Sequence, residues 1–217
     1  MATVLESEVQ TMADMLERLG NIPPQRIRFR PAPGQATVDD VLAIRQSEGR
    51  LCELVDGVLV EKAMSFKASF LAAELIRFLG NFVTTMKAGI VVGEAGMMRI
   101  STGLVRIPDV SFVSWARLPG RRVPDEPVPF LAPNIAVEVL SPGNTTAEMS
   151  RKRDEFFNAT VQLVWIVDPD DRTIAVYKSS DEFILLTEVD TLDGGSVLPG
   201  FRLELRQLFG GMEGPQE

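Results

Sequence analysis

Two acidic residues lie within segments whose other residues are largely apolar. Asp109 belongs to the run 105–113, in which strand alternation would place it on a mainly apolar face. Glu138 is the only polar residue of the run 135–140, which is apolar on both faces as an interior strand is. A buried carboxylate is costly unless it has a partner, so each acid needs a cation, a proton or a metal ion close by.

The residues alone leave two interpretations open for these acids, namely a structural ion pair with an arginine or a shared metal site. Both acids lie at breaks in regular structure. Pro108 precedes Asp109 and cannot donate to a sheet ladder, so it marks a strand edge, end or bulge. The sequence Ser141-Pro142-Gly143 ends the strand that carries Glu138. Two buried acids, each next to the end of a strand, favour the shared metal site.

The composition narrows the chemistry further. The chain has 217 residues, 30 of them acidic and 22 basic, with one cysteine and no histidine. Histidine-based triads, histidine general bases and ordinary zinc sites are therefore excluded. Clustered carboxylates suit Mg²⁺ or Mn²⁺.

The charge pattern permits a phosphate substrate. A net charge of −8 is atypical of a general nucleic-acid binder. However, five arginines and only one acid, Asp109, fall between Ala95 and Arg122. In addition, the basic run Arg151-Lys152-Arg153 lies about two turns into the helix that should follow Glu138. It is either a solvated basic face or the positive group that orients a water and stabilises charge on a phosphate.

The elements that must position these residues follow from periodicity and turn signals. Helical spacing, β-prone runs and the Asp56-Gly57 hairpin signal predict a mixed order of elements. The sequence predicts a hairpin around 56–57, helices over 66–86, 145–157 and 203–209, and strands over 90–93, 97–100, 105–113, 135–140, 161–167, 173–177 and 183–188. This order indicates an α/β (α+β) fold in which helices flank a mixed β-sheet.

We divide the chain into an N-terminal arm with a proline-rich linker (1–35), one domain (36–210) and a flexible tail (211–217). The arm should form an amphipathic helix over 4–19. Because such a helix has no evident place on its own core, we expect it to pack on a second copy and form a homodimer. No run is long enough for a membrane helix and the first ten residues lack a basic signal-peptide segment, so we expect a cytoplasmic protein.

The ordered motifs resemble one known family. They are Glu53-Leu-Val-Asp-Gly, Pro108-Asp109, Val137-Glu-Val-Leu-Ser-Pro142, Lys152 and Val164-Trp-Ile-Val-Asp-Pro169. Together they resemble the Uma-two family of restriction-type endonucleases in the PD-(D/E)XK superfamily, over roughly residues 37–209. The resemblance implies a restriction-endonuclease-like sheet between helices and a Mg²⁺ site built on two carboxylates.

By position, the resemblance gives Asp109 and Glu138 the role of metal ligands and Lys152 that of the catalytic lysine. Glu53 matches the hairpin glutamate and would supply a further carboxylate. Two residues beyond Glu138, where the superfamily usually has lysine, this chain has Leu140; the Uma-type lysine instead comes from the next helix. Family members often carry a histidine near the start of the long helix, where this chain has Lys67.

The sequence thus yields two hypotheses. The first is a Mg²⁺-dependent endonuclease that hydrolyses DNA through Asp109, Glu138 and Lys152. The alternative is a catalytically silent domain of the same fold that acts as a binding or assembly module, which Leu140 and the negative net charge favour.

Overall fold

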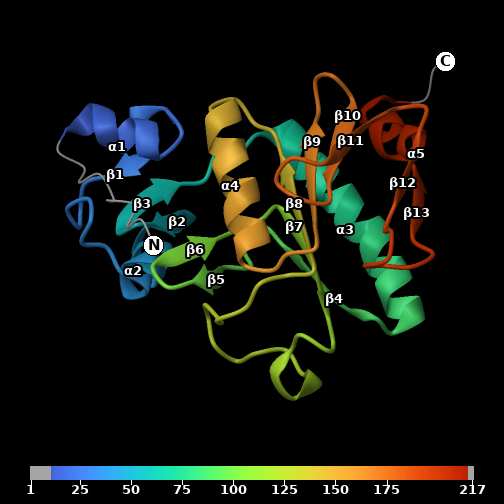
Figure 1. Cartoon of the computed structure of the whole chain (residues 1–217), viewed down its shortest axis with the longest axis horizontal. Coiled ribbons are helices and arrows are strands. Elements are labelled where there is room, and N and C mark those ends of the chain that lie inside the picture. The colour runs from blue at the N-terminus through green and yellow to red at the C-terminus, as the bar shows by residue number, and fades with distance from the viewer. Residues whose placement is uncertain (1–10, 215–217) are drawn as a thin grey trace, which may run out of the picture.

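The computed structural model describes residues 11–214, whose strands form three sheets (Figure 1). The largest sheet has six strands in the order β11-β10-β9-β8-β7-β4. These strands are β4 (Gly89–Gly93), β7 (Val110–Ser114), β8 (Ile135–Val139), β9 (Leu163–Asp168), β10 (Thr173–Tyr177) and β11 (Phe183–Thr187). Only the β8–β9 pair in this sheet is parallel, and the helix α4 (Thr146–Asn158) connects its two strands.

A second sheet has the order β1-β3-β2-β6-β5. Its strands are β1 (Ile27–Arg28), β2 (Cys52–Val55), β3 (Val58–Glu61), β5 (Met98–Ser101) and β6 (Leu104–Arg106). The predicted hairpin joins β2 to β3, and Asp56 and Gly57 both have positive φ angles, of 49° and 73°. The remaining elements are α1 (Met12–Arg18), α2 (Val38–Glu48), the paired strands β12 (Thr191–Asp193) and β13 (Arg202–Glu204), α5 (Leu205–Phe209), and short 3₁₀ turns at Pro24–Arg26, Pro119–Arg121 and Gly210–Met212.

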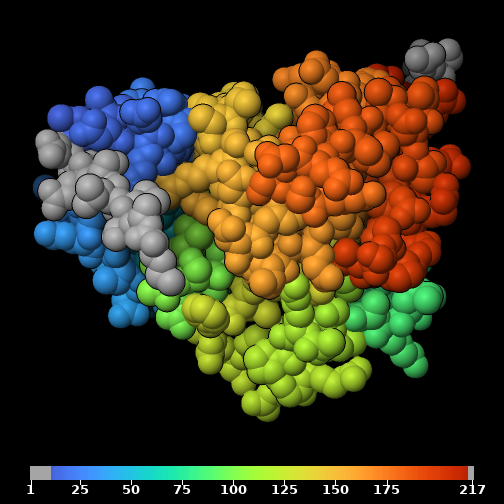
Figure 2. Space-filling model, viewed as in Figure 1, coloured from blue at the N-terminus to red at the C-terminus, as the bar shows by residue number. Residues whose placement is uncertain are grey.

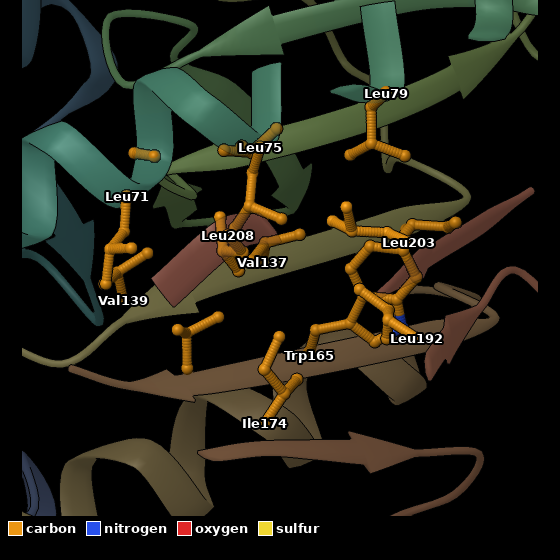
Figure 3. Packing of buried hydrophobic residues seen from close by; sticks show 14 of the residues in the cluster. Leu71, Leu75, Leu79, Val137, Val139, Trp165, Ile174, Leu192, Leu203 and Leu208 are labelled. Atoms are coloured by element: carbon orange, nitrogen blue, oxygen red, sulfur yellow. The ribbon is translucent and has the colours of Figure 1, made fainter. Parts of the chain in front are cut away.

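The helix α3 (Phe66–Met86) covers one face of the six-stranded sheet, as its sequence predicts. Ser65 caps its N-terminus by accepting a hydrogen bond from the amide of Ala68. Its apolar side chains recur every four residues and meet the strands and α5 in one core (Figure 3). That core includes Leu71, Leu75, Leu79, Val137, Val139, Trp165, Leu203 and Leu208. The other face of the sheet lies under α4 (Figure 1).

The run 105–113 differs from its prediction, because it forms two strands in different sheets. β6 pairs with β2 and β5, whereas β7 pairs with β4 and β8. Pro108 lies in the break between β6 and β7, as expected of a residue that cannot donate to a ladder. Asp109 therefore lies where the chain passes from one sheet to the other.

The predicted helix over 203–209 begins only at Leu205, because residues 202–204 pair with β12. Within residues 11–214, no helix combines the length and the apolar character that crossing a membrane would require.

The described part of the N-terminal segment, residues 11–35, packs on its own chain. Met15, Leu19 and Ile22 are buried in a cluster that also contains residues of β2, β3 and α4. The expectation that this segment has no place on its own core is therefore wrong for residues 11–35, while residues 1–10 lie outside the described chain. Figure 2 shows the segment against α4.

Contacts between the segment and α4 are polar as well as apolar. The guanidinium of Arg26 donates to both carboxylate oxygens of Glu148, at 2.9 and 2.7 Å, and Thr145 donates to the carbonyl of Gly20. Gly20 has a φ of 83°, and a Cβ there would come within 2.5 Å of the Glu148 amide nitrogen. The two backbones meet so closely that only glycine fits.

Two methionines of α1 test whether this packing contributes to stability. Met15 is buried and Met12 is 47% exposed. We expect Met15→Ala to lower the free energy of unfolding by about 2–4 kcal/mol and Met12→Ala by less than about 0.5 kcal/mol. Chemical denaturation measures both; equal values for the two variants would contradict the packing.

Candidate active site

Strand pairing brings the two predicted acids close together. Val110 is paired with Val137, and the amide of Asp109 donates to the carbonyl of Val137 at 2.9 Å. Asp109 lies directly before this paired segment, and its charge acts on the carboxyl group of Glu138, so the two acids are close together. Both residues are buried.

Asp109 is held by a lysine that the sequence analysis did not single out. One carboxylate oxygen lies 2.8 Å from Nζ of Lys62, and the other accepts a hydrogen bond of 2.7 Å from the amide of Val139. Nζ of Lys62 also donates to the carbonyl of Ile107. Lys62 directly follows β3 and is itself buried.

Glu138 is contacted by the predicted lysine. Its Oε2 lies 3.1 Å from Nζ of Lys152. Its Oε1 is buried and has no hydrogen-bond partner among the described residues. A buried anionic oxygen without a donor is a costly arrangement that a bound cation would relieve.

Glu53 lies in the same cluster, with both of its oxygens engaged. Oε1 lies 3.1 Å from Nζ of Lys152 and accepts a 3.1 Å hydrogen bond from the amide of Ile107. Oε2 accepts from Arg106 at 2.6 Å. Arg106 in turn contacts Glu155 of α4. The five side chains Glu53, Lys62, Asp109, Glu138 and Lys152 are called the carboxylate–lysine cluster below.

The surroundings give the two glutamates opposite pKa shifts. Burial raises the pKa of Glu138 to about 7; the charge of Asp109 adds to this rise and the charge of Lys152 opposes it. Burial alone would also raise the pKa of Glu53, but Lys152, Arg106 and Lys62 outweigh it and lower that pKa to about 2. Glu53 is thus ionised at neutral pH, whereas Glu138 is divided between its protonated and ionised forms near neutral pH.

Lys152, which contacts both glutamates, is positively charged at neutral pH. Burial alone would lower the pKa of Lys152, but the charges of Glu138 and Glu53 outweigh it and raise the pKa above its usual range. Lys152 therefore does not act as a general base here. Its chemistry is that of a fixed positive charge with three N–H donors.

A divalent ion fits two of these carboxylates. Glu138 Oε1 lacks a donor, and one oxygen of nearby Asp109 is held only by the ammonium group of Lys62, which an ion could replace; both oxygens of Glu53 contact cations or a backbone amide. No group of three or more histidine, cysteine, aspartate or glutamate side chains in residues 11–214 is arranged to hold a metal ion. Two carboxylates, completed by water and phosphate oxygens, still match the way Mg²⁺ usually binds in phosphate-processing sites.

Other predicted basic residues serve the fold. Arg106 is buried in the cluster, Arg117 donates to the carbonyls of residues 132, 133 and 160, and Arg99 lies over the ring of Phe130. Lys67 lies away from the cluster and pairs with Asp170 at 2.5 Å. Three of the five arginines between residues 95 and 122 therefore make structural contacts within the fold.

Sequence reasoning missed Lys62 because Glu61-Lys62 resembles the polar end of an ordinary surface hairpin. Lys62 is buried where it contacts Asp109 and the carbonyl of Ile107, in the connection between β6 and β7. One sequence feature does point to Lys62. It follows the strand that pairs with the strand of Glu53, and side chains of paired strands often approach the same neighbouring segment.

Comparison with known proteins is consistent with this geometry. The Uma2 family model, described as "Putative restriction endonuclease", matches residues 38–206. Among solved structures, "a putative nuclease belonging to DUF820" from Anabaena variabilis ATCC 29413 is 20% identical, with a TM-score of 0.68, over 76% of this chain and 93% of that chain. At that identity the likeness establishes the fold. No curated protein matches.

The buried anion Glu53 has a measurable effect on stability. Glu53→Gln leaves Arg106 and Lys152 short of an anionic partner, and we expect it to lower the free energy of unfolding near pH 7 by about 3–5 kcal/mol. Because the folded-state pKa is depressed from its usual value of 4.5 to about 2, the carboxylate stabilises the fold above pH 4.5 and loses this effect as pH falls toward 2.

The difference between parent and Glu53→Gln should therefore shrink between about pH 5 and pH 3. Denaturation with EDTA present, at a series of pH values, measures it. Glu188→Gln, which removes a half-exposed partner of Arg172, is the control and should cost less than about 1 kcal/mol at every pH. A pH-independent difference for Glu53→Gln would contradict the assignment.

Proposed function

Since this chain belongs to the Uma2 family, we propose that its carboxylate–lysine cluster is the active site of a Mg²⁺-dependent endonuclease that hydrolyses phosphodiester bonds of DNA. One observation carries the proposal. Asp109 and Glu138 are both buried and close together, each contacts a lysine, and one oxygen of Glu138 has no hydrogen-bond partner among the described residues. A buried carboxylate oxygen without a donor calls for an explanation, and a bound cation supplies one.

Asp109 and Glu138 are the proposed metal ligands. The ion would polarise the scissile phosphate and lower the pKa of the attacking water. The poised protonation of Glu138 fits this role, because a cation would favour its ionised form. The backbone amide of Val139 fixes the orientation of the Asp109 carboxylate.

Lys152 is the proposed catalytic lysine. Its Nζ has three donors, and Glu138 and Glu53 take two of them. The third has no acceptor among residues 11–214 and would hold the attacking water or a phosphate oxygen and stabilise the charge that develops there. Glu53, which contacts Lys152 and Arg106, acts as a positioning residue in this proposal rather than as a metal ligand.

Lys62 acts as an internal counter-ion in the metal-free protein. It contacts the Asp109 oxygen that the ion would need, so metal and lysine compete for one carboxylate. Once displaced, its ammonium group would remain beside the phosphate and add to the positive charge around it.

The alternative of a silent binding or assembly module is favoured by one observation. Each acid of the cluster already contacts a lysine, as in a self-contained ionic core. On this alternative the domain would bind no divalent ion at these residues.

Assembly and location are less constrained. The homodimer was inferred from an arm without a place on its own core, and that argument fails for residues 11–35. A dimer still suits an enzyme that cuts two strands, and we retain it, with a cytoplasmic location, as a prediction.

Mn²⁺ titration separates the two functions. In the parent, Mn²⁺ at about 100 times its Kd should stabilise the fold by about 2.7 kcal/mol, seen as a rise in Tm, and should support nicking of supercoiled DNA. Asp109→Asn and Glu138→Gln should abolish both effects. Asp181→Asn, an exposed turn residue, is the control and should retain both.

The metal-free variants should differ from each other. Glu138→Gln replaces a carboxyl whose pKa is about 7, so its cost near neutral pH should stay below about 1 kcal/mol. Asp109→Asn removes the anionic partner of buried Lys62 and should cost about 3 kcal/mol. An unchanged Mn²⁺ shift in either variant would eliminate it as a ligand.

Two lysines test the proposed competition at Asp109. Lys62→Met should lower the Tm of the metal-free protein, because Asp109 loses its cation, but should enlarge the Mn²⁺-induced rise in Tm. Lys67→Met, at an exposed lysine paired with Asp170, is the matched control and should change neither quantity. Equal Mn²⁺ shifts in the two variants would show that Lys62 and the ion do not compete.

A further inference from the structure

A cavity of about 620 Å³ lies beside the carboxylate–lysine cluster, and none of the five residues of that cluster lines it. It is enclosed by the chain that follows β8, one face of α4, and the ends of β9 and β10. Its volume falls within the range typical of small-molecule sites. In Figure 1, α4 lies to the left of these strands, on the side opposite α3.

The cavity and the cluster lie on the same face of the sheet. Leu140 lines the cavity and follows Glu138 by two residues, so the two side chains point to the same side about 7 Å apart. On α4, Lys152 of the cluster precedes Arg153 of the cavity. A ligand with one group at Glu138 could therefore place an adjacent group in the cavity.

Flat and apolar groups form the walls. The guanidinium of Arg153 lies 4.7 Å from the centre of the Tyr177 ring, whose stacking with Phe183 (ring centres 4.8 Å apart) braces it. Leu140 and Ile166 add apolar surface. Nε of Arg153 is buried without a hydrogen-bond partner among the described residues. Planar aromatic and guanidinium groups are the surfaces on which nucleobases stack.

The charges of the cavity disfavour a phosphate there. Among the described residues that line it, Arg153 is the one cation, whereas Asp168 and Asp170 are both at its wall. Asp168 accepts hydrogen bonds from the amides of residues 170 and 171, and Asp170 pairs with Lys67. The acids are thus held by the protein itself, and the space between them suits an uncharged planar group.

We propose that this cavity binds a single unpaired nucleobase of the strand whose phosphate lies at Asp109 and Glu138. The inference rests on the proposed function and extends it to the substrate class. A base within a duplex is stacked on both sides and cannot enter a recess beneath α4, whereas an unpaired base can. The preferred substrate is therefore single-stranded or locally unpaired nucleic acid.

Binding without catalysis tests the proposal. A short single-stranded oligonucleotide that contains one 2-aminopurine is titrated with the parent protein in EDTA, as DNA and separately as RNA, and the same sequence is titrated as a duplex. Contact of the base with the planar groups of the cavity should quench the fluorescence of the single strand, with an affinity about tenfold higher than that for the duplex.

Three variants locate the base. Tyr177→Leu removes the stacking ring and Ser150→Trp fills the cavity from α4, and each should weaken binding of the single strand about tenfold. Phe29→Leu, at a ring that is 53% exposed and outside the cavity, should match the parent. Because Ser150→Trp removes no buried apolar group, it keeps the test valid if Tyr177→Leu does not fold.

The outcomes separate the cavity from the catalytic centre. Unchanged quenching in Ser150→Trp, equal affinity for single strand and duplex, or no quenching in the parent would overturn the proposal. Asp109→Asn should lose the Mn²⁺ shift yet still quench in EDTA. Quenching without any Mn²⁺ effect in the parent would refute the metal site and leave the base site standing; a Mn²⁺ effect without quenching would do the reverse.

Discussion

The ammonium group of Lys152 is the point on which the site depends. It contacts Glu53 of the five-stranded sheet and Glu138 of the six-stranded sheet while its own backbone belongs to α4. One buried cation thus ties three separately formed elements together. Its three donors and two anionic partners fix the distance between the sheets more narrowly than apolar contacts, which tolerate sliding, could do.

Charge balance in this buried region is local. Arg106 lies between Glu53 and Glu155, and Lys62 compensates Asp109, so that no acid of the cluster lacks a cation within contact distance. The residual imbalance is confined to Glu138, where one oxygen has no donor and the pKa rises to about 7. Within the carboxylate–lysine cluster, the unfavourable electrostatics are therefore concentrated at Glu138.

Sequence patterns predicted the parts of this site that lie within regular elements. The strand of Glu138, the helix of Lys152 and the hairpin of Glu53 each have a local signature in alternation, capping or turn residues. The path from one sheet to the other was not predicted, because Pro108 indicates a strand edge, end or bulge without specifying that the chain changes its partner strand there. Lys62 escaped notice for the same reason: its burial arises from contact between sheets, which local patterns do not encode.

The contacts that Arg26 and Gly20 make with α4 have an evolutionary consequence. The family match begins at residue 38, so the chain that grips the helix of Lys152 lies outside the matched region. The reactive groups and the support of the helix that carries one of them therefore belong to parts of the gene that can diverge separately. Substitutions in the leading segment could retune the placement of Lys152 while every residue of the matched domain stays unchanged.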